Sequence, residues 1–146
     1  MGEFSFSFEV RWADVDANRH MRHSAYNDYA AHLRVKLLES IKLDMATMSK
    51  LELGPVLFRE ETVFLREAAM GEQMTVDVKL KKTRPGGSRW SFVHEFTKSD
   101  GKVAARITVD GAWMDLKKRK LTALPEQFHN SLFEIPRTDD FEIETS

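Results

Sequence analysis

Residues 12–26 place acidic, basic and amide side chains close together between two apolar segments. The stretch reads WADVDANRHMRHSAY and contains two Asp, two His and one Asn. A carboxylate can serve as a nucleophile or as a general base for water, and a histidine can pass on a proton near neutral pH. Asp16, Asn18 and His20 form a D-x-N-x-H pattern, which in an extended segment would send all three side chains the same way.

The chain passes from this stretch into a predicted helix, whose N-terminus can polarise a carbonyl group. Unpaired backbone N–H groups and the positive end of the helix dipole point outward there. A substrate carbonyl could rest on the N–H groups near His23, with Asp16 on its other side. A structural role is the alternative, because Asp and Asn are common in turns, where they bond their own backbone. The residues alone leave both interpretations open.

Hydropathy patterns predict one strand, one long helix and then four strands. Apolar residues at helical spacing up to Ile41 predict a helix of about 18 residues, with Ser24 as its N-cap. A single helix buries its apolar side best if the sheet curls around it. We therefore expect an α+β fold in which a curved five-stranded antiparallel sheet wraps one long central helix. Alternating apolar and polar residues predict strands over 4–11, 56–66, 74–81, 90–98 and 103–113.

Length and composition predict a single domain over residues 1–146. The chain has no cysteine, which excludes disulfides, a thiolate nucleophile and a thiolate zinc site. A net charge of −1 predicts no general attraction to nucleic acid or to an anionic membrane. No apolar run is long enough for a spanning helix, so we expect a soluble, cytoplasmic protein. The acidic end, about 137–146, is expected to be partly flexible, after a segment that packs through Phe128, Leu132 and Phe133.

The histidines of this stretch do not predict a metal site. His20 and His23 are three residues apart, a spacing seen in metal sites, but no further histidine lies nearby in the sequence. The polar content is explained by a helix start, and we expect neither a metal nor another cofactor.

Two segments of the sequence are similar to segments of a known protein family. VRWADVDANRHMRHSAYNDYAAHLR, residues 10–34, is similar to the signature segment of the hotdog-fold acyl thioesterases, in particular the 4-hydroxybenzoyl-CoA thioesterase type. The D-x-N-x-H pattern is similar to that of the plant acyl-ACP thioesterases. The run GKVAARITVDGAWMDLKKRKLTALP is similar to the family's final strand. The resemblance implies a hotdog fold and hydrolysis of an acyl thioester of CoA or of acyl carrier protein.

The resemblance also implies roles for individual residues. The second Asp of the family's Asp-x-Asp is its catalytic carboxylate, and that position is Asp16 here; Asp14 would be a supporting residue. The backbone N–H that polarises the thioester carbonyl falls at about His23. Asn18 and His20 match the acyl-ACP type, in which both assist the carboxylate.

Two departures separate the chain from the family pattern. Many members have Gly where Arg19 stands, and many have Glu on the helix where this chain has Ala31. The missing Glu argues against a catalytic role for a second carboxylate on the helix, although Arg34 keeps the basic position that follows it in the family.

We expect substrate contacts at Tyr26, which opens the long helix in the family, and at Arg84 and Arg89. The two arginines flank a predicted turn and could meet the phosphates of CoA, although solvated strand ends explain such charges equally well. Pairing of sheet edges across a two-fold axis predicts a homodimer or a dimer of dimers.

Two other functions stay open on the same fold. One is a dehydratase or hydratase acting on acyl thioesters, for which His20 with Asp16 could supply the acid and base. The other is a non-catalytic acyl-CoA binding module, against which the presence of Asp16 argues.

Overall fold

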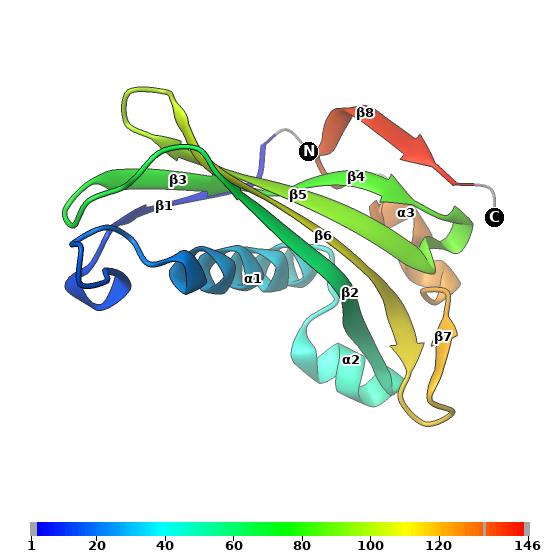
Figure 1. The fold of residues 1–146 in the computed structure, drawn as a ribbon. Helices are drawn as coiled ribbons and strands as arrows, with labels where there is room; N and C mark the ends of the chain where they lie inside the picture. The colour runs from blue at the N-terminus through cyan, green and yellow to red at the C-terminus, as the bar shows by residue number, and fades with distance from the viewer. Residues whose placement is uncertain (1–2, 133, 145–146) are drawn as a thin grey trace.

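The computed structural model describes residues 3–132 and 134–144, which form one curved sheet that arches over the long helix α1 (Figure 1). The helices are α1 (His23–Ser40), α2 (Met45–Leu51) and α3 (His129–Leu132). The strands are β1 (Ser5–Glu9), β2 (Leu53–Phe64), β3 (Gln73–Asp77), β4 (Lys79–Thr83), β5 (Arg89–Lys98), β6 (Val103–Asp115), β7 (Lys120–Thr122) and β8 (Arg137–Ile143).

Strands β5 and β6 form the middle of the sheet. β5 pairs with β3 and β4 along different parts of its length, and β6 pairs with β2 and β7. β1 flanks β3, and β8 flanks β4 as the parallel neighbour in a sheet whose other pairs are antiparallel. The prediction of an α+β fold with a curved antiparallel sheet is confirmed apart from the β4–β8 pair, but the predicted number of five strands is wrong, because eight strands are present among the described residues.

The segment 74–81, predicted as one strand, is divided into β3 and β4 at Asp77 and Val78. The backbone oxygen of Asp77 accepts a hydrogen bond from Nδ1 of His94 at 2.8 Å, and its Oδ1 accepts one from the Glu95 backbone N–H at 2.7 Å. These side-chain contacts replace the regular ladder at this point. Alternation along the sequence did not predict the break because it depends on residues about seventeen positions away.

The segment after β6 contains β7, which the sequence analysis did not predict. The basic run 117–120 turns the chain back onto β6, and Oδ1 of Asp115 accepts hydrogen bonds from the backbone N–H groups of Lys117 and Lys118. β7 then pairs with the end of β6, with Trp113 opposite Thr122.

The acidic end of the chain forms β8 where we expected a partly flexible tail. β8 runs parallel to β4, and Nζ of Lys81 lies 2.8 Å from Oδ2 of Asp140. The carboxylates of this segment thus face the lysines of β4, which explains why an apolar-poor segment can pair. Phe128 is buried and Leu132 packs against the core, as predicted. Residues 133 and 145–146, to which these predictions also extend, lie outside the described residues.

α1 has 18 residues, as expected from the spacing of its apolar side chains. The prediction of one long central helix is not confirmed in that form, because α1 lies along one side of the sheet and two shorter helices are also present (Figure 1). Ser24 is not the N-cap. The cap residue is Arg22, and the Ser24 hydroxyl accepts a hydrogen bond from the Arg22 guanidinium. No helix in the described part of the chain is both long and apolar enough to cross a membrane.

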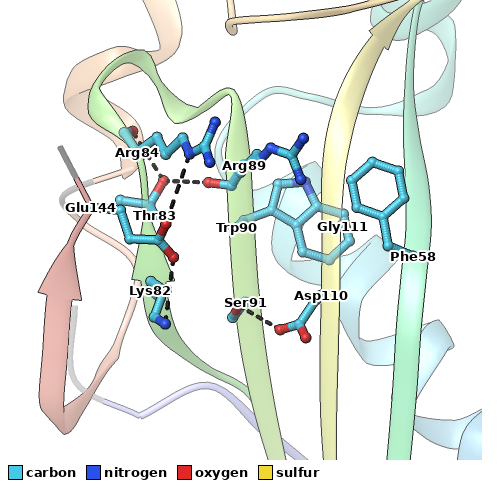
Figure 2. A pocket seen from close by; sticks show the side chains of 10 residues that line it. All are labelled: Phe58, Lys82, Thr83, Arg84, Arg89, Trp90, Ser91, Asp110, Gly111 and Glu144. Carbon is cyan, nitrogen blue, oxygen red and sulfur yellow. Dashed lines mark hydrogen bonds and ion pairs between the residues drawn. The ribbon is translucent and has the colours of Figure 1, made fainter. Parts of the chain in front are cut away.

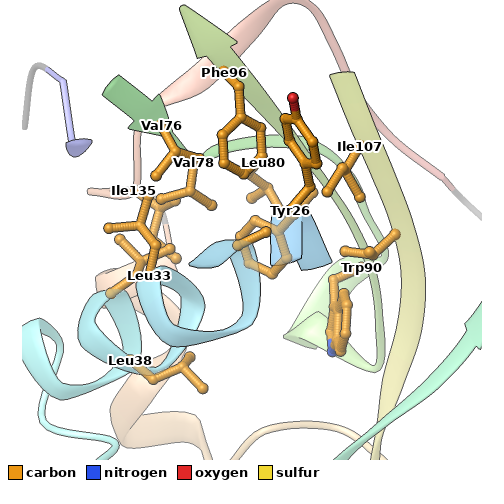
Figure 3. Packing of buried hydrophobic residues seen from close by; sticks show 14 of the residues in the cluster. Tyr26, Leu33, Leu38, Val76, Val78, Leu80, Trp90, Phe96, Ile107 and Ile135 are labelled. Atoms are coloured by element: carbon orange, nitrogen blue, oxygen red, sulfur yellow. The ribbon is translucent and has the colours of Figure 1, made fainter. Parts of the chain in front are cut away.

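The core lies between α1 and the sheet (Figure 3). α1 contributes Leu33 and Leu37, which meet Phe96 and Ile107 from β5 and β6. These four side chains are at most 2% exposed. Burying apolar area of this kind is the main favourable term that holds the helix against the sheet.

Candidate active site

Asp14 is buried and anchors the polar loop that precedes α1. Its carboxylate accepts hydrogen bonds from the Arg11 backbone at 3.0 Å, from the Arg11 guanidinium at 2.9 and 3.1 Å, and from the Tyr29 hydroxyl at 2.7 Å. Burial acts to raise the pKa of Asp14, but these hydrogen bonds outweigh it and hold the pKa at about 2. Burial and the bond to Asp14 raise the pKa of Tyr29 to about 12. Asp14 is therefore a charged structural residue, in agreement with the supporting role expected for it.

Asp16 lies at the start of a tight turn. Its backbone N–H donates to the His20 carbonyl at 2.9 Å, and its Oδ1 accepts from the backbone N–H groups of Asn18 at 2.9 Å and of His20 at 3.4 Å. Residues 16–20 form a turn and are not extended. The expectation that an extended backbone would send the side chains of Asp16, Asn18 and His20 the same way is therefore wrong. Among the described residues Oδ2 of Asp16 has no protein partner, which leaves one oxygen open to a ligand.

An open cavity of about 420 Å³ lies against the exposed carboxylate of Asp16. Two large apolar side chains beside it are unusually accessible, with Trp12 81% and Met70 54% exposed. A carboxylate next to exposed apolar side chains can hold water against an apolar substrate. The lining residues are Trp12, Val15, Asp16, Arg19, Ala69 and Met70.

Sequence reasoning did not identify Trp12 or Met70 as site residues. Trp12 stands two residues before the first Asp of the polar stretch, and this position in the sequence could have indicated a place in the site. Met70 follows β2 at more than fifty residues from Asp16, and a bridge between His20 and Ala69 brings that segment to the loop. Only the tertiary fold supplies this contact.

The two predicted histidines differ in their surroundings. Nε2 of His20 lies 3.1 Å from Oε2 of Glu67, and both side chains are partly or largely exposed, so the contact can be exchanged for solvent. His23 is the first residue of α1 and is exposed. The backbone N–H of Arg22 donates to the Asp14 carbonyl at 2.7 Å, which fixes where the helix begins. The first N–H groups of α1 have no partner within the helix, as at any helix start.

Tyr26 lies in the core. It is 2% exposed and packs edge to face against Phe64 and Phe96, the second of which is labelled beside it in Figure 3. Burial raises its pKa. Its ring packs in the core, and the predicted contact of Tyr26 with substrate stays a prediction.

Arg84 and Arg89 line one small cavity of about 180 Å³ at the end of β4 and β5 (Figure 2). Nε of Arg84 lies 3.8 Å from Oε2 of Glu144, and Nζ of Lys82 lies 3.4 Å from the other oxygen of that carboxylate. The Arg89 guanidinium stacks 5.2 Å from the centre of the Phe58 ring. The structure thus brings the two predicted arginines together, but beside a carboxylate that offsets part of their charge.

No three His, Asp or Glu side chains within residues 3–132 and 134–144 gather in a way that could hold a metal ion. His20 and His23 belong to no such group.

Comparison with known proteins identifies the family. The family model of the thioesterase-like superfamily matches residues 10–132, and the chain belongs to this superfamily. No curated relative of the chain was found. The predicted resemblance to hotdog thioesterases is confirmed.

Solved structures of low sequence identity share the fold. A hypothetical protein from Staphylococcus aureus in complex with CoA is 22% identical over 96% of this chain and 89% of its own, with a TM-score of 0.87. A 1,4-dihydroxy-2-naphthoyl-CoA thioesterase from Synechocystis is 18% identical over 91% of this chain and 97% of its own, with a TM-score of 0.80. The probable thioesterase YbaW from Escherichia coli is 17% identical over 92% and 99% of the two chains, with a TM-score of 0.75.

Asp14→Asn tests the role of the buried carboxylate. Because the pKa of Asp14 is lowered from 3.8 to about 2 by folding, its ionisation stabilises the protein fully above pH 3.8. This contribution, about 2 kcal/mol by linkage, is lost as the pH falls toward about 2. Urea unfolding across this pH range should give a lower free energy of unfolding for Asp14→Asn than for the unaltered protein, and this difference should shrink as the pH falls. Asp28→Asn, at an exposed site on α1, is the control, and a deficit independent of pH would contradict this account.

Arg19→Gly tests a backbone constraint in the same turn. Arg19 has φ of 65°, in the left-handed region, which costs an L-residue about 1 kcal/mol and costs glycine little. We expect the variant to gain up to about 1 kcal/mol in unfolding free energy, measured by urea denaturation. Arg22→Gly, at φ of −68°, is the matched control and should show no gain. A free energy of unfolding for Arg19→Gly equal to or below that of the unaltered protein would contradict backbone strain at Arg19.

Proposed function

We propose that this protein hydrolyses acyl thioesters of CoA or of acyl carrier protein, with Asp16 as the reacting carboxylate. The observation that carries the proposal is the exposed carboxylate of Asp16 on the wall of the 420 Å³ cavity, seven residues before the start of α1 at His23. Membership of the thioesterase-like superfamily supports the reaction class.

The proposed chemistry uses two groups of the site, the backbone N–H of His23 at the helix start and the carboxylate of Asp16. The thioester carbonyl would rest on the backbone N–H of His23, where the helix dipole stabilises the negative charge that develops on oxygen. Asp16 takes a proton from water as the water oxygen bonds to the carbonyl carbon, or it attacks that carbon itself. The carbon–sulfur bond then breaks and the sulfur leaves as the thiol after taking a proton. On the first route this releases the free acid; on the second it leaves an anhydride on Asp16, which a water molecule cleaves to the free acid and the Asp16 carboxylate. The backbone bonds to Oδ1 hold the carboxylate in one orientation, which favours either route.

Asn18 and His20 are proposed to position water or to protonate the leaving sulfur. Both belong to the turn that Asp16 begins, and His20 can take up this role because its contact with Glu67 is largely exposed. Exposed ion pairs of this kind contribute little to stability, so exchanging the partner costs little.

The carrier group is proposed to be CoA or acyl carrier protein, with Arg84 and Arg89 of the other copy in the pair proposed below near its phosphates, because within one copy their cavity shares no lining residue with the Asp16 cavity. A structure with the same fold is described in complex with CoA, which supports this choice. A phosphate would compete with Glu144 for Arg84. A cytoplasmic location belongs to the same proposal, in line with the absence of cysteine.

We also propose that two copies pair along β2, as a homodimer or within a dimer of dimers. Among the described residues β2 pairs only with β6, so its other edge is available to a strand. Four large apolar side chains of β2 are 43–52% exposed. An exposed apolar edge strand favours association with another strand. These side chains are Leu57, Phe58, Val63 and Phe64.

Asp16→Asn tests the proposed catalytic carboxylate. The amide can neither accept the proton nor attack, so kcat/KM for acyl-CoA should fall by at least about 100-fold. Thiol release from short, long and aromatic acyl-CoA substrates measures it, and circular dichroism checks the fold. Asp100→Asn, in an exposed loop, is the control and should keep its activity. Near-normal hydrolysis by the Asp16 variant would sink the assignment.

The same assay separates the other functions. A hydratase would change the absorbance of an enoyl-CoA without releasing thiol, and a binding module would bind acyl-CoA with no thiol released above background. Either outcome in the unaltered protein would replace the thioesterase proposal.

A double variant tests the β2 interface. Leu65 follows β2 directly and is 47% exposed. Val63→Lys with Leu65→Lys places like charges beside each other across a two-fold axis, which should shift the protein to monomers in light scattering after size exclusion. Ile143→Lys on β8 is the control, because this residue is similarly exposed on another strand. An unchanged dimer in the double variant would rule out this edge.

A further inference from the structure

A second cavity, of about 270 Å³, lies beside the middle of α1 and is separate in its lining from the Asp16 cavity. α1, β2, β5 and β6 contribute its walls. Figure 3 shows Leu38 on α1 and Trp90 on the sheet. Most of the lining is hydrocarbon. Its larger apolar side chains are Val35, Leu38, Leu57 and Phe92, together with the indole rings of Trp90 and Trp113.

Arg34 brings a positive charge to this cavity. Its Nη1 lies 2.9 Å from Nε2 of His94, and Nδ1 of His94 lies 2.8 Å from the carbonyl oxygen of Asp77. A carbonyl only accepts, so Nδ1 holds the ring proton and Nε2 accepts the bond from Arg34. Burial and the charge of Arg34 lower the pKa of His94 to about 3, and the ring stays neutral.

The charge of Arg34 is therefore held by a neutral ring. Glu60 is the acidic residue whose charge favours the charged form of Arg34, but no ion pair joins the two in the described part of the chain. Arg34 is partly buried, and this burial lowers its pKa. A cation with part of its water removed and no anion beside it is costly, and an anionic ligand would relieve that cost.

The indole N–H groups of Trp90 and Trp113 point to the same ligand chemistry. Both are buried, and neither finds an acceptor among residues 3–132 and 134–144. With Arg34 they are the polar side-chain groups of the cavity lining, and all three donate. A cavity with donors, a positive charge and hydrocarbon walls is complementary to a carboxylate on an apolar stem.

We propose that this cavity binds the end of the acyl group remote from the thioester, and that the preferred acyl groups carry a carboxylate there. The proposal rests on the thioesterase function proposed above. The carboxylate would accept hydrogen bonds from the free N–H groups of Arg34, while the stem contacts the indoles and Leu38. A plain alkyl end would cover Arg34 without replacing its water, so it should be rejected.

The position of the cavity indicates a long stem. Arg34 follows His23 by about three helical turns, or about 16 Å along α1. Ala31 lines the cavity one turn before Arg34, and its methyl side chain leaves space beside β2. The acyl group would run along α1 from the helix start to Arg34.

Thiol release from matched substrates tests the proposal. Each pair consists of the CoA monothioester of a dicarboxylic acid and the acyl-CoA with the same number of carbons and a methyl end, at short, medium and long stems. We expect the unaltered protein to prefer the carboxylate member at the long stem by at least about 10-fold in kcat/KM. Equal rates, or a preference for the methyl end, would overturn the proposal. No thiol release from any substrate would instead overturn the thioesterase function.

Variants of Arg34 tie the preference to this residue. Arg34→Gln should bring the ratio of the two kcat/KM values to about one, and Arg34→Lys should keep part of it by keeping the charge. Arg106→Gln removes an exposed arginine paired with Glu95 and should leave the ratio unchanged. A ratio that survives in Arg34→Gln would overturn the assignment.

Binding can be measured without turnover. In a Trp12→Phe background the emission comes from Trp90 and Trp113, because the chain has three tryptophans. The free long-chain dicarboxylic acid should change this emission to saturation, and more tightly than the matched monocarboxylic acid. The difference should disappear when Arg34→Gln is added. No response, or equal binding of the two acids, would contradict the proposed cavity chemistry even if thiol release is observed.

Discussion

The buried carboxylate of Asp14 is the interaction on which the candidate active site depends. It accepts hydrogen bonds from the backbone and guanidinium of Arg11 and from the hydroxyl of Tyr29, so it joins the end of β1 to α1. Its backbone carbonyl accepts the N–H of Arg22, the residue before α1. One residue therefore holds both ends of the loop. The turn that contains Asp16 is closed between these fixed points, and its carboxylate remains at the surface.

Asp14 and Asp16 are only two residues apart, but their surroundings favour different roles for the two carboxylates. Asp14 has its oxygens occupied by Arg11 and Tyr29, and it stays charged because those bonds outweigh burial. Asp16 receives only backbone N–H groups on one oxygen and stands beside the exposed ring of Trp12. Saturating the first carboxylate makes it structural. The open oxygen of the second, next to apolar surface, makes it the candidate for chemistry.

The sheet supplies the second set of constraints. Gly111 on β6 lacks a side chain where a Cβ would lie 2.4 Å from the ring of Trp90, so the cavity wall at Trp90 depends on this glycine. His94 bonds the backbone of Asp77 where β3 gives way to β4, and its other nitrogen holds Arg34. The irregularity in the sheet and the charge in the cavity therefore share one buried histidine.

The sequence by itself determined α1, the alternating strands and the place of the polar stretch, because these patterns depend on residues within a few positions of one another. The residues alone also indicated a helix start near His23 and left Asp16 with a structural or a catalytic interpretation. Family resemblance then selected Asp16 over Asp14 as the predicted catalytic carboxylate. Only the tertiary structure decided that Tyr26 is buried, since its burial depends on Phe96, which is seventy positions away. The division at Asp77 and the pairing of β8 with β4 were decided in the same way. Contacts between distant residues set these features, and local periodicity carries no information about such contacts.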